Sequence, residues 1–256
     1  MRVKNFLKLF MEQQQRRVVS WFSCGAASAY ATWLAHQKYS DMDAVYCRVR
    51  QEHEDNLRFL DEFSSKTGIK VKIITNEQFD GNIHYVFIQR KFIKNQYGAP
   101  CTMILKKDMR KAYQRSTDLQ VFGYTVDEQD RADRFIDANN EVNEWFPLIE
   151  NNIAKSDCYA WVNKMGIKMP VMYTLGYNNN NCIGCVKGGM GYWNKIRVDF
   201  PVQFERMALV ERYIGHAINK DKNGPVYLDE LDPTRGKLTL NEDMPADCGF
   251  TCEAKK

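Results

Sequence analysis

Cysteines gather in the C-terminal third of the chain, and two pairs of them have spacings typical of metal ligands. Cys182 and Cys185 are separated by two residues in a loop rich in asparagine and glycine, and Cys248 and Cys252 are separated by three. Thiolates spaced in this way can turn toward one metal ion, and four of them complete a tetrahedral zinc site. With Cys101, three or four of these thiols could instead hold a [4Fe–4S] cluster.

The same cysteines also suit thiol chemistry without a metal, in which one thiolate attacks and a second resolves the product as a disulfide. The chain has eight cysteines, and a reducing compartment disfavours structural disulfides. We interpret Cys47 and Cys158 as core residues because each lies in an apolar strand or helix pattern. Unligated loop cysteines are the remaining alternative.

An anion site is indicated where an apolar run from Val18 to Phe22 gives way at once to small residues. This pattern predicts a strand that ends, turns and starts a helix, whose first N–H groups and positive dipole end can bind phosphate. Two serine hydroxyls in the turn can also donate to an anion. An ordinary tight βα turn is the alternative. The residues that we assign to this anion site are Ser23, Cys24, Gly25, Ala26, Ala27 and Ser28.

Positive charge follows Cys101 in a segment that we predict to be a helix over residues 103–115. A cysteine close to several cations can have a lowered thiol pKa. We assign Cys101 and Lys106 to the catalytic site and interpret Lys107 and Lys111 as part of a solvated basic face.

The elements that must position these residues alternate along the chain between strand and helix patterns. Strands rich in Val and Ile alternate with helical periods, which favours a doubly wound α/β fold whose mainly parallel sheet has helices on both faces. Ligands of such sheets bind beyond the carboxyl ends of the strands, where the turn at 23–28 falls. The predicted strands are 17–22, 43–49, 70–75 and 119–124, and the predicted helices between them include 28–36 and 54–67.

Three regions follow from this pattern. We expect a basic amphipathic helix at 1–16, an α/β domain at 17–175 that contains the anion site, and an irregular cysteine-rich loop, helix and tail at 176–256 packed on the same domain. Apolar residues make up 44% of the chain, enough for a substantial core. No apolar run approaches the roughly 20 residues of a membrane helix. The first residues do not form a signal peptide, so we expect a cytoplasmic protein.

The net charge of +4 fits an anionic small molecule better than a nucleic acid. The turn at 23–28 resembles the pyrophosphate loop of the adenine-nucleotide α-hydrolase superfamily, which includes ATP pyrophosphatases and phosphoadenosine phosphosulfate (PAPS) reductases. The usual ATP-pyrophosphatase form is Ser-Gly-Gly-x-Asp-Ser. Here Cys24 replaces the first Gly and Ala27 replaces the Asp, which removes a magnesium contact and makes the loop more like the reductase branch.

Two further segments resemble PAPS reductases. Gly123, near the end of a strand, precedes an acidic helix start with Arg131, in a layout similar to the segment where an Arg faces the nucleotide's anionic groups; Arg134 is the fallback. The Cys-x-x-Cys at 182–185 resembles the cluster-binding part of adenylyl-sulfate reductases. The adjacent Cys-Cys pair of that family is represented here by Cys101 alone.

The terminal Asp-Cys-Gly-Phe resembles the C-terminal segment of sulfonucleotide reductases, whose cysteine attacks sulfur, and this resemblance assigns the nucleophile to Cys248. Along 18–252 the match is to PAPS-reductase-like proteins of bacteria and their phages. It implies an enzyme that binds PAPS or adenylyl sulfate, holds its anionic groups with Lys106 and Arg131, and releases sulfite with a thioredoxin-type electron donor.

Two alternatives stay open. The first is an adenylating sulfur transferase that uses ATP with Mg²⁺ and acts on tRNA or another nucleic acid, with Cys101 or the Cys182/Cys185 site handling sulfur or an Fe–S cluster. The second is a non-catalytic nucleotide-binding module with structural zinc. A homo-oligomer is compatible with each of these, and none of them involves a membrane.

Overall fold

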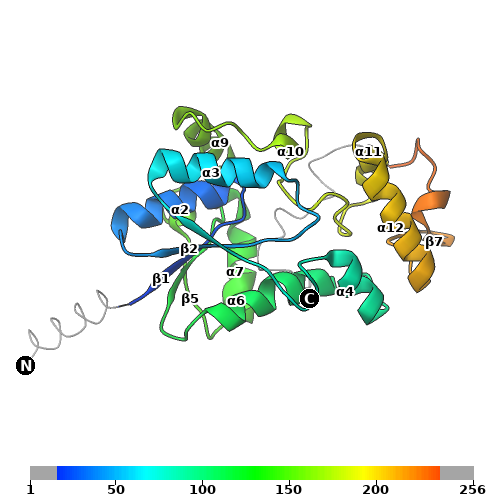
Figure 1. The fold of residues 1–256 in the computed structure, drawn as a ribbon, viewed down its shortest axis with the longest axis horizontal. Coiled ribbons are helices and arrows are strands. Elements are labelled where there is room, and N and C mark those ends of the chain that lie inside the picture. The colour runs from blue at the N-terminus through cyan, green and yellow to red at the C-terminus, as the bar shows by residue number, and fades with distance from the viewer. Residues whose placement is uncertain (1–15, 237–256) are drawn as a thin grey trace, which may run out of the picture. The chain divides into compact units, whose positions relative to one another are not determined.

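The structure is a computed structural model, and it describes residues 16–236 (Figure 1). Residues 1–15 and 237–256 lie outside the described part, and with them nearly all of the expected N-terminal helix and both Cys248 and Cys252. The described chain groups into two compact units. The first contains residues up to Tyr46, Glu62–Lys72 and Tyr113–Ile167, and the second contains Cys47–Asp61, Ile73–Ala112 and the chain from Lys168 onward.

A five-stranded sheet in the order β3-β2-β1-β4-β5 confirms the predicted α/β fold, with helices packed around it (Figure 1). β1 pairs in parallel with β2 on one side and β4 on the other, and β4 pairs in parallel with β5. The chain order therefore reverses at β1, which is where ligands of such sheets bind. The strands are β1 (Val18–Trp21), β2 (Asp43–Cys47), β3 (Val71–Ile74), β4 (Leu119–Val121) and β5 (Asn143–Trp145).

The first unit is organised around β1, whose four residues are all buried. A continuous apolar run is expected of a central parallel strand, because both of its faces are covered. Phe22, which follows β1, packs on Phe63 with ring centroids 4.8 Å apart. The Oγ atom of Ser20 lies 2.8 Å from Oγ1 of Thr32, which ties β1 to the helix that follows it. The helices of this part are α2 (Ala26–Lys38), the C-terminal half of α3 (Asp55–Thr67), α7 (Gln129–Ala138), α8 (Pro147–Glu150) and α9 (Lys155–Lys164).

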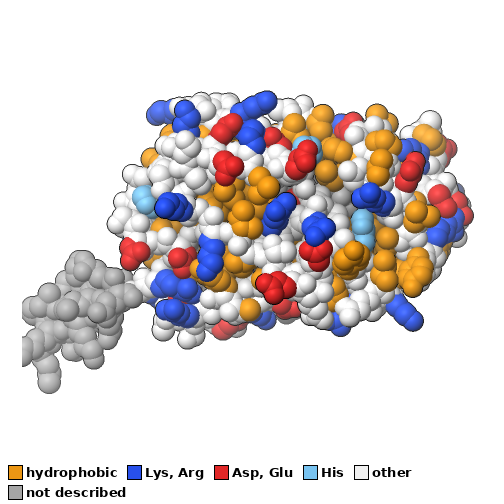
Figure 2. All heavy atoms as spheres, in the orientation of Figure 1, with side chains coloured by type: hydrophobic (Ala, Val, Ile, Leu, Met, Phe, Trp, Pro, Cys, Tyr) orange, Lys and Arg blue, Asp and Glu red, His pale blue; other side chains and the backbone are white. Residues whose placement is uncertain are grey.

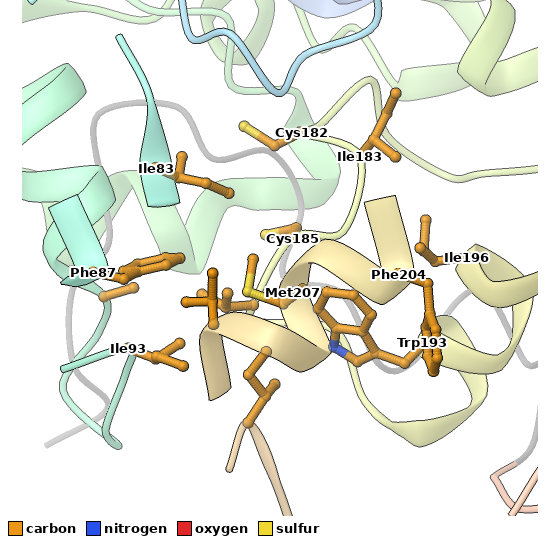
Figure 3. Close-up of a cluster of buried hydrophobic side chains, with 14 of the residues drawn as sticks. Ile83, Phe87, Ile93, Cys182, Ile183, Cys185, Trp193, Ile196, Phe204 and Met207 are labelled. Atoms are coloured by element: carbon orange, nitrogen blue, oxygen red, sulfur yellow. The ribbon is translucent and has the colours of Figure 1, made fainter. Parts of the chain in front are cut away.

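The second unit has an apolar core of its own, which includes both cysteines of the Cys-x-x-Cys loop (Figure 3). Helix α12 packs against α11, α4 and the short helical turn at Leu228–Glu230. Glu211 of α12 accepts hydrogen bonds from the N–H groups of Ile218 and Leu228, which fixes the small hairpin to the helix. The other elements are α4 (Ile83–Arg90), α5 (Pro100–Thr102), α6 (Asp108–Tyr113), α10 (Val171–Thr174), α11 (Met190–Asp199), α12 (Pro201–Ile214), β6 (Asn219–Asp221) and β7 (Gly224–Val226).

The predicted helix at 103–115 differs from the structure in one respect that matters for the site. Its first part, Met103–Lys107, is a π-helical turn between α5 and α6. A π turn adds a residue to the helix and changes which side chains face inward. Within residues 16–236, no helix is both long and apolar enough to cross a membrane.

Candidate functional site

The turn after β1 has the geometry of an anion-binding helix start. Gly25 is the residue before α2, its backbone is extended, and no side chain caps the helix. The first N–H groups of a helix have no acceptor within it, and the positive end of the dipole lies there. Cys24 has a φ of +58° and is fully buried. This left-handed backbone, which glycine adopts most easily, reverses the chain so that α2 can begin.

The hydroxyl groups of Ser23 and Ser28 stabilise the turn through hydrogen bonds within it. Oγ of Ser28 accepts hydrogen bonds from the N–H and from the Oγ of Ser23, both at 3.0 Å, and donates to the carbonyl of Gly25 at 3.0 Å. The sequence suggested that both hydroxyls donate to an anion, but here both hydroxyl hydrogens are used within the turn. The backbone N–H groups at the start of α2 are therefore the donors that the turn offers.

Gly123 lies against the first turn of α2. A Cβ atom at this position would lie 2.6 Å from Cα and 2.7 Å from N of Ser28. Only a glycine allows the end of β4 to approach the helix start so closely, because the obstacle is backbone and not a flexible side chain. The residue therefore shapes the predicted nucleotide site by packing.

Arg131 is held near the carboxyl end of β4. Its Nη1 lies 2.6 Å from Oε1 of Glu128, and its guanidinium lies over the ring of Tyr124 at 4.7 Å. Glu128 in turn accepts a hydrogen bond from the N–H of Thr125 at 3.3 Å. These contacts fix the guanidinium and compensate its charge, while Arg134 is exposed.

In the second unit, a buried ion pair joins Nζ of Lys106 to Oε1 of Glu52 at 2.8 Å. Lys107 and Arg110 are also buried, with 8% and 0% of their surface exposed. The prediction of a solvated Lys107 is wrong, because the π-helical turn brings neighbouring lysines inward together, whereas Lys111 is exposed as expected. Cationic side chains are rarely so deeply buried unless they have a structural or functional partner.

Cys47 lies close to these charges but is a neutral core thiol. Burial raises its pKa to about 12, and the nearby Lys106 and Arg110 oppose that shift only in part. Burial also raises the pKa of Cys158 to about 12. The interpretation of both cysteines as core residues is confirmed, because both are buried and neither favours the thiolate.

The Cys-x-x-Cys loop is shaped by two aromatic residues of α11. The side chains of Cys182 and Cys185 point to the same side of the loop, toward Ile83 and Phe87 (Figure 3), and are 7% and 6% exposed. Tyr192 reaches into this loop and is hydrogen-bonded to its backbone at both cysteines.

The ring of Trp193 lies beneath Gly184, where a Cβ atom would be 3.0 Å from it. Gly184 has a φ of +71°, which a glycine adopts without strain, and so the loop can close over the indole. Cys101 is partly buried and packs against the same apolar core.

One known protein family matches most of this chain. The sequence profile of the phosphoadenosine phosphosulfate reductase domain matches residues 17–188. The chain belongs to this family. The match spans the pyrophosphate-loop turn, Lys106 and the Cys-x-x-Cys, and it confirms the family resemblance that the sequence motifs indicated.

The comparisons with solved structures and with curated proteins add no functional assignment. One similar solved structure is that of the U34-tRNA thiolase NcsA from Methanococcus maripaludis with its [4Fe-4S] cluster. It is 14% identical in sequence, and the alignment covers 81% of this chain and 74% of that one with a TM-score of 0.41. No curated protein sequence matches the chain.

The cysteines of this PAPS reductase-family chain fit a metal only in part. Within residues 16–236, no three His, Cys, Asp or Glu side chains come together as a metal site. Cys101 is thus not grouped there with Cys182 and Cys185. The Cys-x-x-Cys loop itself offers two thiols, so a metal bound there would need further ligands. Cys248 and Cys252 lie outside the described part.

Some residues of the candidate site were missed by sequence reasoning. Glu52 carries no motif, and its only signal is its place a few residues after β2. Asn56 lies within the predicted helix at 54–67 and carries no motif, yet it is buried and its Oδ1 accepts a hydrogen bond from Nδ2 of Asn180 at 2.7 Å. This pair joins the segment after β2 to the asparagine-rich stretch that precedes Cys182, within the second unit.

Proposed function

We propose that this PAPS reductase-family chain is an enzyme that binds an adenine sulfonucleotide at the Ser23–Ser28 turn and reduces its sulfonyl group to sulfite. The observation that carries the proposal is the uncapped start of α2, which offers backbone donors. In addition, Ala27 stands where a magnesium-binding carboxylate would be needed for ATP cleavage. Such a turn favours an anion that arrives without a metal. Gly123 and Ser28 hold the turn in this form.

The chemistry needs a thiolate nucleophile and a second thiol. The Cys248 thiolate attacks the sulfonyl sulfur, the bond from sulfur to the phosphate oxygen breaks, and the nucleotide leaves, so that an enzyme thiosulfonate forms. A thiol of a thioredoxin-type donor then attacks the cysteine sulfur and expels sulfite, which leaves a mixed disulfide. The two electrons come from the two thiols. Lys106 is the cation that the family resemblance proposes for the anionic groups; it is buried with Glu52 as its ion-pair partner.

A second function is favoured by one observation. Cys182 and Cys185 are almost fully buried, and a dithiol that exchanges with an external reductant needs to be accessible. Burial suits ligands of a metal or a cluster better, as in an ATP-dependent sulfur transferase acting on tRNA or another nucleic acid, or in a nucleotide-binding module with structural zinc. The missing carboxylate at Ala27 opposes the use of Mg²⁺ with ATP.

A product assay tests the proposal. The full chain, purified without oxygen, is incubated separately with PAPS, adenylyl sulfate and ATP in the presence of a dithiol, and sulfite and pyrophosphate are measured. We expect sulfite from a sulfonucleotide and none from the C248S variant. The K106A variant should lose activity while K111A, which changes an exposed lysine nearby, keeps it. Pyrophosphate from ATP without sulfite would establish the transferase in its place.

Metal analysis of the same preparation separates the roles of the cysteines. Iron with acid-labile sulfide indicates a cluster, zinc indicates a structural site, and a metal-free active protein indicates thiol chemistry alone. The C182S variant should lose whatever metal is present. The C47S variant is the control, because Cys47 is a buried thiol at the end of β2.

A further inference from the structure

Two hydroxyl groups are buried between β1 and α2 in the first unit. Ser20 of β1 is 1% exposed, and Thr32 of α2 is fully buried. Ser20 lies opposite Ala44 and Val121 of the two neighbouring strands, in the middle of the sheet. Serine and threonine are mostly exposed in proteins, and burial of a hydroxyl costs free energy unless a hydrogen bond compensates it. The pair therefore needs a reason beyond the packing of the core.

The hydrogen bonds of this pair run in one direction, toward the Ser23–Ser28 turn. Oγ1 of Thr32 lies 2.7 Å from the carbonyl oxygen of Ser28, and in that contact only the hydroxyl can donate. A threonine hydroxyl has a single hydrogen. In the 2.8 Å contact between the two hydroxyls, that of Ser20 must then be the donor. Ser20 thus fixes the hydroxyl of Thr32, and Thr32 holds the carbonyl of Ser28.

Ser28 connects Thr32 to the first peptide group of α2. Its Oγ donates to the carbonyl oxygen of Gly25 at 3.0 Å, and the N–H of Ala29 donates to the same oxygen at 3.0 Å. In a planar trans peptide, the N–H of Ala26 points away from the carbonyl of Gly25. The two donors that fix this carbonyl therefore also fix the Ala26 N–H, which points out of the helix start.

An anion at this turn depends on such local donors because the charges of the chain are mixed. The sequence has 36 Lys and Arg residues and 32 Asp and Glu residues. On the face drawn in Figure 2, blue and red side chains are interspersed over the described residues. Mixed charges produce a weak field at a distance, so the direction of the backbone N–H groups sets how tightly an anion is held.

We propose that Thr32 is a positioning residue for the anion site. Together with Ser20, it holds Ser28 so that the first N–H groups of α2 point at the bound anion. Thr32 itself does not contact the anion, because it is fully buried and lies one helical turn beyond Ser28. The inference rests on the proposed function, since it takes the anion to be that of an adenine sulfonucleotide.

Nucleotide binding and stability, measured on the same variants, test this role. T32V keeps the shape of the side chain without its hydroxyl, and S20A/T32V removes both partners. Replacement of both partners by apolar groups is close to neutral for stability, so we expect the double variant to unfold at nearly the urea concentration of the wild type. Calorimetric titration with PAPS and with adenylyl sulfate should show binding weakened at least about 5-fold in both variants, the loss expected of one misdirected hydrogen bond. T32S keeps the hydroxyl and should bind like the wild type.

T67V is the matched control. Oγ1 of Thr67 donates to the carbonyl oxygen of Phe63 at 2.7 Å, which is the same contact within α3 that Thr32 makes with Ser28 within α2. This variant should leave nucleotide binding unchanged. Equal weakening in T67V and T32V would indicate a general loss of helix stability and would overturn the proposal. A T32V protein that binds like the wild type, or a T32S protein that binds like T32V, also overturns it.

Amide hydrogen exchange separates this inference from the proposed function because it needs no ligand. The N–H of Ser23 is bonded to Oγ of Ser28 at 3.0 Å. In the free protein, we expect this N–H to exchange at least about 3-fold faster in T32V than in the wild type or T67V. A wild type that binds neither nucleotide would contradict the proposed function, and the exchange rates would then decide the role of Thr32 by themselves. Unchanged exchange at Ser23 in T32V overturns the proposal.

Discussion

The N–H group of Cys185 donates a hydrogen bond to the phenol oxygen of Tyr192 at 2.9 Å. The same hydroxyl donates to the carbonyl of Cys182 at 3.2 Å. One buried side chain thus bridges the backbone at both cysteines and sets their spacing. Gly188 allows this, since a Cβ there would lie 2.0 Å from the ring of Tyr192.

Removal of this hydroxyl should loosen the Cys-x-x-Cys loop. Y192F keeps the ring but leaves the buried N–H of Cys185 without its acceptor, which should lower the free energy of unfolding by about 1–3 kcal/mol. Urea unfolding measures this loss, and metal content after dialysis measures the effect on the cysteines. Y177F is the control because the hydroxyl of Tyr177 bonds Asp199 and not the loop. Equal metal loss in both variants would argue against a specific role for Tyr192.

The close approach of Gly123, just after β4, to the start of α2 predicts that position 123 does not tolerate a larger residue. The G123A variant places a Cβ against the backbone of Ser28, and neither segment can move without opening the turn. We expect the free energy of unfolding to fall by more than about 2 kcal/mol and nucleotide binding to be lost. G68A is the comparison, since no atom lies within 4 Å of a Cβ there and only its positive φ adds strain. Thermal unfolding and equilibrium binding measure the two effects.

The two serines of the turn should differ in importance. S28A removes the acceptor of the Ser23 N–H and the donor to the Gly25 carbonyl, whereas S23A removes the hydroxyl that donates to Oγ of Ser28. We therefore expect S28A to weaken nucleotide binding about 10-fold more than S23A, since each lost bond to a buried group costs about 1 kcal/mol or more. Calorimetric titration compares them. If both variants weaken binding equally, the hydroxyls contact the ligand directly and do not act as a brace.

His84 should make the second unit less stable in acid. Burial, with a smaller effect of the nearby Arg206, lowers the pKa of His84 to about 4 from its usual 6.5. The unfolded chain therefore takes up a proton in a range where the folded chain does not, and the free energy of unfolding falls as the pH decreases from about 6.5 to about 4. Urea unfolding of wild type and H84Q across this range measures the slope. A slope that is the same in H84Q would exclude His84 as its source.

The sequence predicted the sheet and the turn because both depend on local patterns. A run such as Val18 to Phe22 can only be a buried strand in this context, and small residues after it define the turn. The burial of Lys107 was not predictable, because helical periodicity assumes a regular helix and the π-helical turn breaks it. The ion pair of Lys106 joins residues 54 positions apart, which no local pattern records. The interpretation of Gly123 needed the position of Ser28 in space.

We propose that the Ser23–Ser28 turn binds the anionic end of an adenine sulfonucleotide. The most direct measurement is calorimetric titration of PAPS and adenylyl sulfate, without Mg²⁺, into the wild type and into A27D, which places a carboxylate in the turn. We predict one nucleotide bound per wild-type chain and binding at least about 10-fold weaker in A27D, because like charges repel at the helix start. Absence of binding to the wild type, or equal affinity in A27D, would contradict the claim.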